Sequence, residues 1–234
     1  RLASSGDRKR GAMERKPSSR STARAETERA ILEAAEAVFA EHGYRGATTG
    51  MIAARAGIPK ANLHYYFATK EALYRQVVEN IFTIWLEAAN SFDDCEDPEE
   101  ALTRYITTKM DISRQHPMGS KVWANEILHR APVIQDYLET TLRDWTASRI
   151  AIIDRWVAEG RMDPVDPRTL LYMIWATTQH YADFIHQIET LNGGAPLSDE
   201  QFALARENVV RIVLSGVGIR PKACAGAQGG DSAA

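Results

Sequence analysis

A short run of small and polar side chains has the residue types and the spacing that recognition of DNA bases requires. At about 100° per residue along a helix, these side chains point to one side, where amide, imidazole and phenol groups can hydrogen bond to base edges in a major groove. The groups belong to Lys60, Ala61, Asn62, His64 and Tyr65. We therefore expect a helix that presents this side to double-stranded DNA.

Further groups near this helix could bind phosphate oxygens and hold it in the groove. Hydroxyl and ammonium groups and a helix N-terminus all serve this purpose in DNA-binding proteins. The predicted DNA-binding set is Thr48, Thr49, Lys60, Ala61, Asn62, His64, Tyr65, Tyr66 and Lys70. In the basic segment that precedes it, Arg20 and Arg24 could add backbone contacts.

Two short helices around a tight turn would position these groups. Thr48 or Thr49 can cap the first helix by accepting a bond from a free backbone N–H. Gly57 lies where helices commonly end in a left-handed residue, and Pro59 lies where a helix can begin without losing a hydrogen bond. This punctuation predicts a helix-turn-helix. An ordinary helical pair with a packed Tyr-Tyr-Phe cluster fits the same residues, and the pattern alone leaves both interpretations open.

A second polar cluster lies within an otherwise apolar stretch at 170–189. Trp175 and Gln179 are spaced to share a helix face, so an aromatic platform would lie beside an amide that could bind the edge of a flat heterocycle. Buried polar groups require partners. The alternative is therefore that these groups bond across a helix interface, above all His180, Asp183 and His186.

The composition indicates a soluble globular protein. Of 234 residues, 44% are hydrophobic and 25% charged, and no apolar run reaches the roughly 20 residues that a membrane helix requires. The N-terminus lacks the apolar core of a secretory signal, so we expect a cytoplasmic protein. Cys95 and Cys224 have no second Cys or His at metal-ligand spacing, which predicts no metal site. Since no nucleophile–base pair or glycine-rich phosphate loop occurs, we expect neither an enzyme nor a cofactor.

Charge is divided unevenly along the chain. Residues 1–75 contain 14 Lys/Arg and 8 Asp/Glu, a net charge of +6, whereas residues 76–234 contain 14 and 23, a net charge of -9. A phosphate-binding surface needs positive charge. The N-terminal part therefore suits nucleic acid, and the remainder does not.

Apolar residues recur at three- and four-residue steps along most of the chain, which predicts an all-α fold. We expect segments 1–21 and 221–234 to be disordered, a DNA-binding domain at 22–75 and a larger helical domain at 76–220. An acidic loop is expected at 92–98. The expected helices are 22–42, 48–56, 59–67, 69–91, 98–115, 118–130, 132–159, 166–191 and 198–215.

The segment GYRGATTGMIAARAGIPKANLHYYFATKEALY, residues 43–74, resembles the DNA-binding domain of the TetR family of bacterial repressors. The resemblance rests on G-Y-x-x-x-T-T, I-A-x-x-A-G, Y-Y-F and K-E-x-L. It implies a homodimeric transcriptional regulator that binds a palindromic operator with its first helices, a small molecule with the next, and its own copy with the last two.

A second, narrower resemblance indicates which class of small molecule the protein binds. MIWATTQHYADF, residues 173–184, is similar to a branch of this family that senses uracil and controls pyrimidine breakdown. That resemblance implies a pyrimidine-binding set of Trp85, Lys109, Trp123, Glu126, Trp175, Gln179 and Tyr181. The chain departs from the branch at His64, where an apolar residue is expected, and over residues 122–132, which match only at Glu126 and the Ala-Pro end.

Two other interpretations compete with a pyrimidine-responsive repressor. One is a regulator of the same family that responds to an unrelated apolar or cationic compound, such as an inducer of an efflux pump. The other is a helical interaction module without a specific operator. Dependence of ligand binding on Gln179 distinguishes the first, and selection of a DNA sequence from a random pool distinguishes the second.

Overall fold

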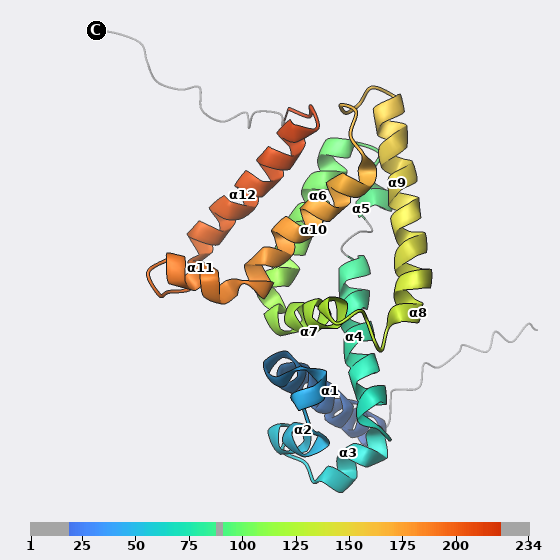
Figure 1. The fold of residues 1–234 in the computed structure, drawn as a ribbon, viewed down its shortest axis with the longest axis vertical. Helices are drawn as coiled ribbons and strands as arrows, with labels where there is room; N and C mark the ends of the chain where they lie inside the picture. Colours follow the sequence, from blue (N-terminus) through green and yellow to red (C-terminus); the bar gives the residue numbers. More distant parts are fainter. Residues whose placement is uncertain (1–18, 88–90, 221–234) are drawn as a thin grey trace, which may run out of the picture.

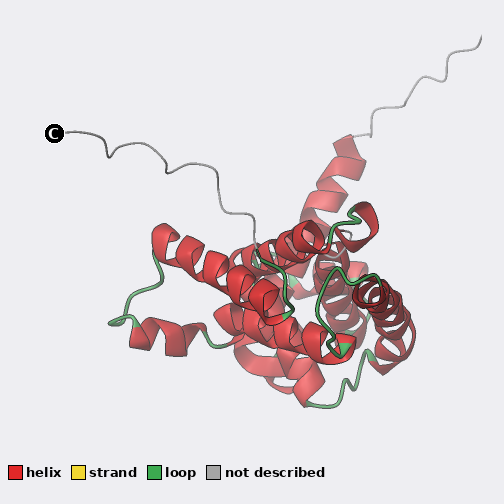
Figure 2. Ribbon diagram, turned by 90° about the horizontal axis from the view of Figure 1, so that it is seen from above, coloured by secondary structure: helices red, strands yellow, loops and turns green. Residues whose placement is uncertain are grey.

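The computed structural model describes residues 19–87 and 91–220, and every regular element in these ranges is helical (Figures 1 and 2), which confirms the predicted fold class. The elements are α1 Ser19–Gly46, α2 Thr49–Arg55, α3 Lys60–Tyr66, α4 Lys70–Glu87, α5 Ser91–Asp94, α6 Pro98–Gln115, α7 Pro117–Leu128, α8 Gln135–Tyr137, a π-helical turn Leu138–Leu142, α9 Arg143–Ala158, α10 Pro167–Asp183, α11 Ile185–Leu191 and α12 Asp199–Gly216. No helix in the described ranges is long and apolar enough to span a bilayer.

Side-chain caps fix where several helices begin. Thr48 and Thr69 accept backbone N–H bonds at the starts of α2 and α4, Asp97 and Asp166 do so for α6 and α10, and Ser198 forms a full capping box with Gln201 at α12. Each cap satisfies an N–H group that would otherwise lack a partner. Helix starts are therefore the boundaries that the sequence predicts best.

Several expected boundaries are wrong. The first helix begins at Ser19, inside the segment expected to be disordered, and continues past a break at Gly43, whose φ is 66°. The expected acidic loop begins with the short helix α5. The expected end of the 69–91 helix falls largely on residues 88–90, outside the described residues, as do the segments 1–18 and 221–234.

The helix expected at 132–159 is divided by the π-helical turn. The hydroxyls of Thr140 and Thr146 donate to the carbonyls of Asp136 and Leu142 at 2.7 Å. These bonds compete with regular helical hydrogen bonding around the turn. The helix expected at 166–191 also divides, because Phe184 leaves the helical conformation with φ -113° and ψ 28°.

Two hydrophobic cores organise the helices. The first joins α1, α2, α3 and α4 and also includes Val122 of α7 and Ile134 from the loop before α8. The second joins α5, α6, α9, α10 and α12. Helix α4 connects the two parts, running from the lower end in Figure 1, beside α1, α2 and α3, toward the larger helical unit above it.

Candidate nucleic-acid interface and ligand cavity

The turn between α2 and α3 is closed by backbone bonds. Gly57 has φ 69°, the left-handed conformation that glycine adopts without strain. Its N–H and that of Ile58 donate to the carbonyls of Ala54 and Ala53 at 3.2 and 3.0 Å. Leu63 of α3 is fully buried against this pair. Helix α3 is therefore held by its inner face, with its outer face free.

The outer face of α3 carries the side chains predicted to contact bases. Lys60, Ala61, Asn62, His64 and Tyr65 are all exposed, and Tyr65 reaches 73% exposure. The structure thus brings the predicted base-reading residues together on one surface.

The predicted phosphate contacts do not all remain available. Thr48 is exposed, while Thr49 and Tyr66 are half-buried. Lys70 differs, because its ammonium donates to the carbonyls of Tyr44 and Ala47 at 2.7 and 3.0 Å and lies 4.5 Å from the centre of the Tyr44 ring. Lys70 therefore holds the turn before α2, and a phosphate contact by the same ammonium stays a prediction.

Arg24 of α1 approaches the same surface. Its guanidinium carbon lies 5.8 Å from the centre of the Tyr65 ring and 5.9 Å from that of Tyr66, and the two rings meet edge to face at 5.5 Å. The basic segment therefore continues as a helix beside α3. Arg24 adds positive charge to the candidate DNA interface.

A cavity of about 420 Å³ lies at the boundary between the two cores, between α4, α6, α7, the π-helical turn, α9 and α10. Predicted ligand residues on its wall are Trp85, Lys109, Trp123, Trp175 and Gln179. Sequence reasoning missed Phe82, Leu86, Tyr105, Ile127, Leu138, Leu142, Trp145 and Tyr172, which complete the wall. Their apolar and aromatic character at helical spacing indicates core positions, so the sequence gives no signal that separates them from buried neighbours.

Aromatic side chains make up most of this wall, and contacts among them hold their rings in place. The indole N–H of Trp175 donates to the Tyr105 hydroxyl at 2.8 Å, and the centre of the Trp175 ring lies 6.2 Å from that of Trp145. On the opposite side, Trp123 stacks on Phe82 with ring centres 5.2 Å apart. Such a cavity favours a flat ring, which can stack between these surfaces.

Lys109 supplies the cavity with a buried amine. Its side chain is 5% exposed, and its ammonium lies 3.9 Å from the centre of the Trp85 ring. Burial lowers the pKa of Lys109 to about 7, while the Asp183 carboxylate acts in the opposite direction. Near neutral pH this amine can therefore either donate from a cation or exist as a neutral group.

Two residues of the predicted ligand set lie outside the cavity wall. Glu126 is 2% exposed, and its carboxylate accepts the Tyr74 hydroxyl at 2.9 Å and the Val133 N–H at 2.8 Å. Tyr181 packs edge to face on Phe202 of α12. Glu126 instead connects α7, which lines the cavity, with Tyr74 of α4.

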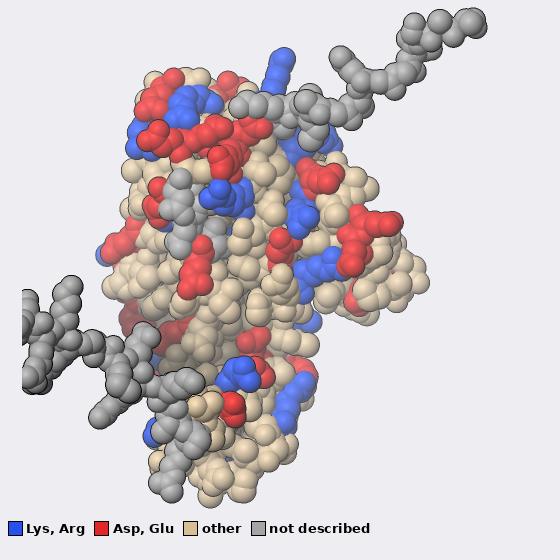
Figure 3. All heavy atoms as spheres, turned by 180° about the vertical axis from the view of Figure 1, so that it is seen from behind, with Lys and Arg blue, Asp and Glu red and all other residues tan. Residues whose placement is uncertain are grey.

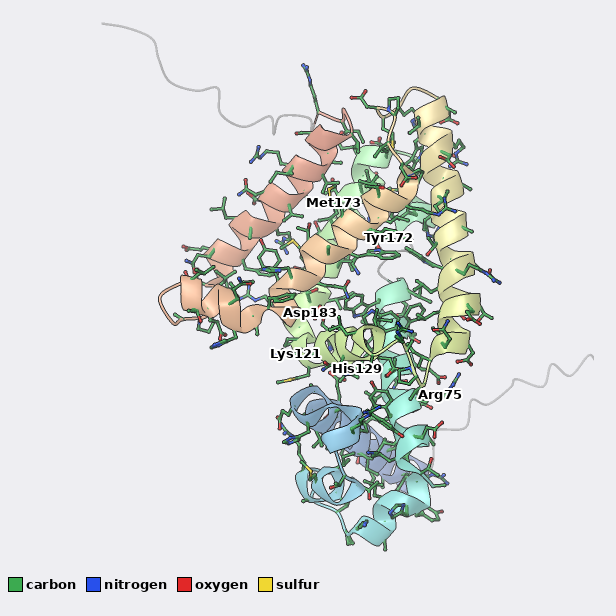
Figure 4. The ribbon with its side chains drawn as sticks, viewed as in Figure 1. Arg75, Lys121, His129, Tyr172, Met173 and Asp183 are labelled. Carbon is green, nitrogen blue, oxygen red and sulfur yellow. The ribbon has the colours of Figure 1, made fainter. Side chains whose placement is uncertain are left out.

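Asp183 illustrates the cross-helix alternative. It accepts a hydrogen bond from Ser120 of α7, and burial raises its pKa against the lowering effects of that bond and of Lys121. Figure 4 shows Asp183 near Lys121 where α10 meets α7. His180, also expected to bond across a helix interface, stacks on Phe184 with ring centres 4.9 Å apart.

Further contacts tie the two parts of the molecule together. Arg75 of α4 donates to the Val133 carbonyl at 2.9 Å and also pairs with Asp136 (Figure 4). A side chain at Gly119 of α7 would approach Ile81 to 3.0 Å and the Glu36 carboxylate to 3.3 Å. Helix α7 therefore packs closely on both α1 and α4.

The surface charge agrees with the uneven division along the chain. In Figure 3 acidic side chains gather near the upper end of the larger helical unit, with basic ones among them. The tip of the lower unit is mostly uncharged in this view, and both basic and acidic groups lie above it. Base readout needs uncharged hydrogen-bonding groups, and basic flanks suit phosphates.

Comparisons with known proteins cover nearly the whole described chain. The family model for bacterial regulatory proteins of the tetR family matches residues 31–77, and that for the C-terminal region of YcdC-like proteins matches residues 78–220. The HTH-type transcriptional regulator RutR of Escherichia coli K12 is 40% identical over 203 residues, which are 87% of this chain and 95% of RutR.

Solved structures show the same fold. The regulator SCO4942 from Streptomyces coelicolor superposes with a TM-score of 0.64 at 25% identity, covering 83% of this chain and 99% of that one. The ketosteroid regulator KstR2 of Mycobacterium tuberculosis superposes with a TM-score of 0.65 at 22% identity, covering 81% and 94%. These relatives are transcriptional regulators rather than enzymes.

Proposed function

The chain belongs to the TetR family of bacterial transcriptional regulators, and from this premise we propose that it is a homodimeric repressor whose operator binding is controlled by uracil or a related pyrimidine. The cavity between the two cores carries this proposal, because it combines stacking surfaces with an amide and an amine. The similarity to RutR, and to the uracil-sensing branch that residues 173–184 resemble, supports the pyrimidine class.

The DNA contacts follow from the exposed face of α3. In the dimer, two copies of this helix would occupy successive major grooves roughly 34–36 Å apart. Asn62, His64 and Tyr65 would contact bases, with Ala61 allowing close approach. Lys60, Thr48, Thr49, Tyr66 and Arg24 would contact the backbone or support residues that do.

The dimer surface is proposed to lie on α11 and α12. Leu191, Leu204 and Ile212 are 81%, 60% and 60% exposed, and these helices form one side of the larger unit in Figure 1. Neighbouring exposed apolar groups mark association surfaces. Ile212→Glu should therefore convert the dimer to monomers in sedimentation experiments, and an unchanged dimer would relocate the interface.

A pyrimidine fits the chemistry of the cavity. Its flat ring can stack among Trp85, Trp123 and Trp175, while its alternating carbonyl and N–H groups match an amide at Gln179. Lys109 can donate to a ring carbonyl. A lipophilic cation would gain little from Gln179 and would be opposed by the Lys109 ammonium, which distinguishes the pyrimidine from the efflux-inducer alternative.

Coupling is proposed to pass from the cavity through α7 to α4. Trp123 and Ile127 line the cavity on either side of Glu126 in sequence, and Glu126 binds Tyr74. Tyr74 in turn packs on Phe39 and Tyr44 at 4.8 Å between ring centres. A ligand relieves repression only as far as it prefers the conformation that cannot span the operator.

Calorimetric titration of the purified protein with uracil, thymine and two unrelated purines tests the effector. We expect saturable micromolar or tighter binding of uracil at one site per subunit. Release of the protein from an operator selected from a random DNA pool then tests the response. If none of these compounds binds, the assignment of a pyrimidine effector is wrong. If the protein selects no DNA sequence, the proposal that it is a repressor is wrong.

Variants of α10 locate the site. Trp175→Ala should keep operator affinity and lose the response to uracil, because it removes the stacking surface. Tyr181→Phe is the matched control, since Tyr181 lies on the same helix but outside the cavity wall. A Trp175→Ala protein with an unchanged response would exclude this cavity.

A further inference from the structure

A groove of about 290 Å³ lies beside the cavity, between the π-helical turn, α9 and α10. Leu138, Leu142, Tyr172 and Trp175 line both spaces. Figure 4 shows Tyr172 on the side of α10 that faces α9, with Met173 on another side. Since the π-helical turn supplies Leu138 and Leu142, the irregular helix forms part of the shared wall. The cavity and the groove are therefore neighbours that meet at these four side chains.

The charged groups along this path are all cationic. Arg143 and Arg168 are the charged residues on the wall of the groove, and Lys109 is the one on the wall of the cavity. No carboxylate is among these wall residues, although residues 76–234 carry a net charge of -9. Clustered charge of one sign in a concave site attracts ligands of the opposite sign.

Neighbouring acids leave both guanidinium groups available. The Nε of Arg143 lies 3.6 Å from the Asp144 carboxylate, and with exposures of 71% and 77% this is a weak surface pair. Asp166, which precedes Arg168, accepts both the N–H and the hydroxyl of Thr169 at 2.7 and 2.6 Å and caps α10. Asp166 also interacts electrostatically with Arg168, so an incoming anion competes with one exposed carboxylate at each arginine.

We propose that the groove is an anion subsite and that the protein binds a pyrimidine nucleoside monophosphate more tightly than the free base. The ring occupies the cavity, the sugar passes Tyr172, and the phosphate lies between Arg143 and Arg168. Guanidinium groups suit phosphate because their N–H groups can bind two oxygens at once. This inference rests on the proposed function, since it assigns the ring to the same cavity.

Titration of the full-length protein with uracil, uridine and uridine 5′-monophosphate tests the subsite. The phosphate should tighten binding at least about tenfold relative to uridine, and this difference should shrink as the salt concentration rises. Binding of uracil with no gain from the phosphate would overturn the subsite and leave the proposed function intact. If none of the three compounds binds, both the anion subsite and the proposed pyrimidine-responsive function are wrong.

Variants separate the phosphate from the ring. Arg143→Gln together with Arg168→Gln should weaken binding of the monophosphate about tenfold and leave uracil affinity within about twofold. Arg155→Gln provides a control, because Arg155 is exposed on α9 but does not line the groove. Equal loss for uracil and the monophosphate, or equal loss in the control, would contradict the assignment of the phosphate to this groove.

Discussion

The DNA-binding helices and the larger helical unit satisfy their buried polar groups to different degrees. Among the described residues, the buried side-chain atoms without a hydrogen-bond partner belong to Ser113, Trp145, Arg149 and Trp156, all in the larger unit. Where the two units meet, by contrast, the buried Glu126 carboxylate of α7 accepts the Tyr74 hydroxyl of α4. A surface that reads DNA requires one fixed shape, whereas a unit that accepts a ligand tolerates unpaired groups that can rearrange.

Truncation in the first core should have the largest effect on stability. Phe39 is 1% exposed and packs edge to face on Tyr74, so Phe39→Ala should lower the free energy of unfolding by about 3–5 kcal/mol. Urea denaturation measures the loss. Tyr65→Ala, at an exposed aromatic of the same unit, should change stability little. A loss below about 1 kcal/mol for Phe39→Ala would show that this core is not the tightly packed one.

Replacing the buried lysine of the cavity should instead make the protein more stable. Lys109→Met should raise the free energy of unfolding by roughly 1–3 kcal/mol near pH 7, because it removes a buried amine that lacks a full counter-charge. The folded-state pKa of Lys109, about 7, lies below its usual value of 10.5. Between these values the unfolded chain binds more protons, so wild-type stability rises with pH.

The advantage of Lys109→Met should therefore shrink as pH rises from 7 toward 10. Denaturation of both proteins at several pH values measures this difference. Lys121→Met, on the half-buried surface of α7, serves as the control and should show no such trend. A constant difference between wild type and Lys109→Met would contradict the lowered pKa.

Removing a hydrogen bond between the two units should lower the stability of the protein by an intermediate amount. Tyr74→Phe removes one of the bonds to the buried Glu126 carboxylate and should cost about 1.5–2 kcal/mol. Tyr44→Phe is the matched control, because its ring belongs to the same aromatic cluster. A double-mutant cycle of Tyr74→Phe with Glu126→Gln measures the coupling. Additive effects in stability and in effector response would exclude this contact as a link.

The smallest effect should come from the helix cap at the DNA-binding surface. Thr48→Ala removes the side-chain bond to the Met51 N–H and should cost about 1 kcal/mol. Hydrogen exchange should then be faster in α2 than in the helices of the larger unit. Thr48→Ser keeps the hydroxyl and should restore protection. Uniform loss of protection throughout the protein would show that the two units do not open separately.

Local patterns predicted the DNA-binding part because its signals are adjacent in the sequence. The cap at Thr48 and the turn at Gly57 are fixed by near neighbours, so their positions follow from residue type. The carbonyl contacts of Lys70 could not be predicted, because its partners Tyr44 and Ala47 come from an earlier segment. Nothing near Lys70 in the sequence distinguishes a lysine that holds carbonyls from one that meets phosphate.

The cavity could be predicted only in part, because helices distant in the sequence build it. Trp175 and Gln179 stand out as polar or amphipathic groups in an apolar helix. In the sequence, Tyr105 and Trp145 look like ordinary core residues. Only the folded structure shows that both lie beside Trp175 on the cavity wall. Helix interruptions such as Phe184 also escaped prediction, since no glycine or proline marks the break.

The place of the cavity between the two cores has a consequence for how the protein melts. Trp85 and Trp123 pack with the first core, and Trp145 and Trp175 pack with the second. A ring bound between them would therefore contact side chains of both cores. Ligand present at 100 times its dissociation constant stabilises the folded form by about 2.7 kcal/mol. This gain is lost if either core opens. An effector bound in this cavity would therefore link the two cores, and two overlapping melting steps in its absence should merge into one cooperative step in its presence.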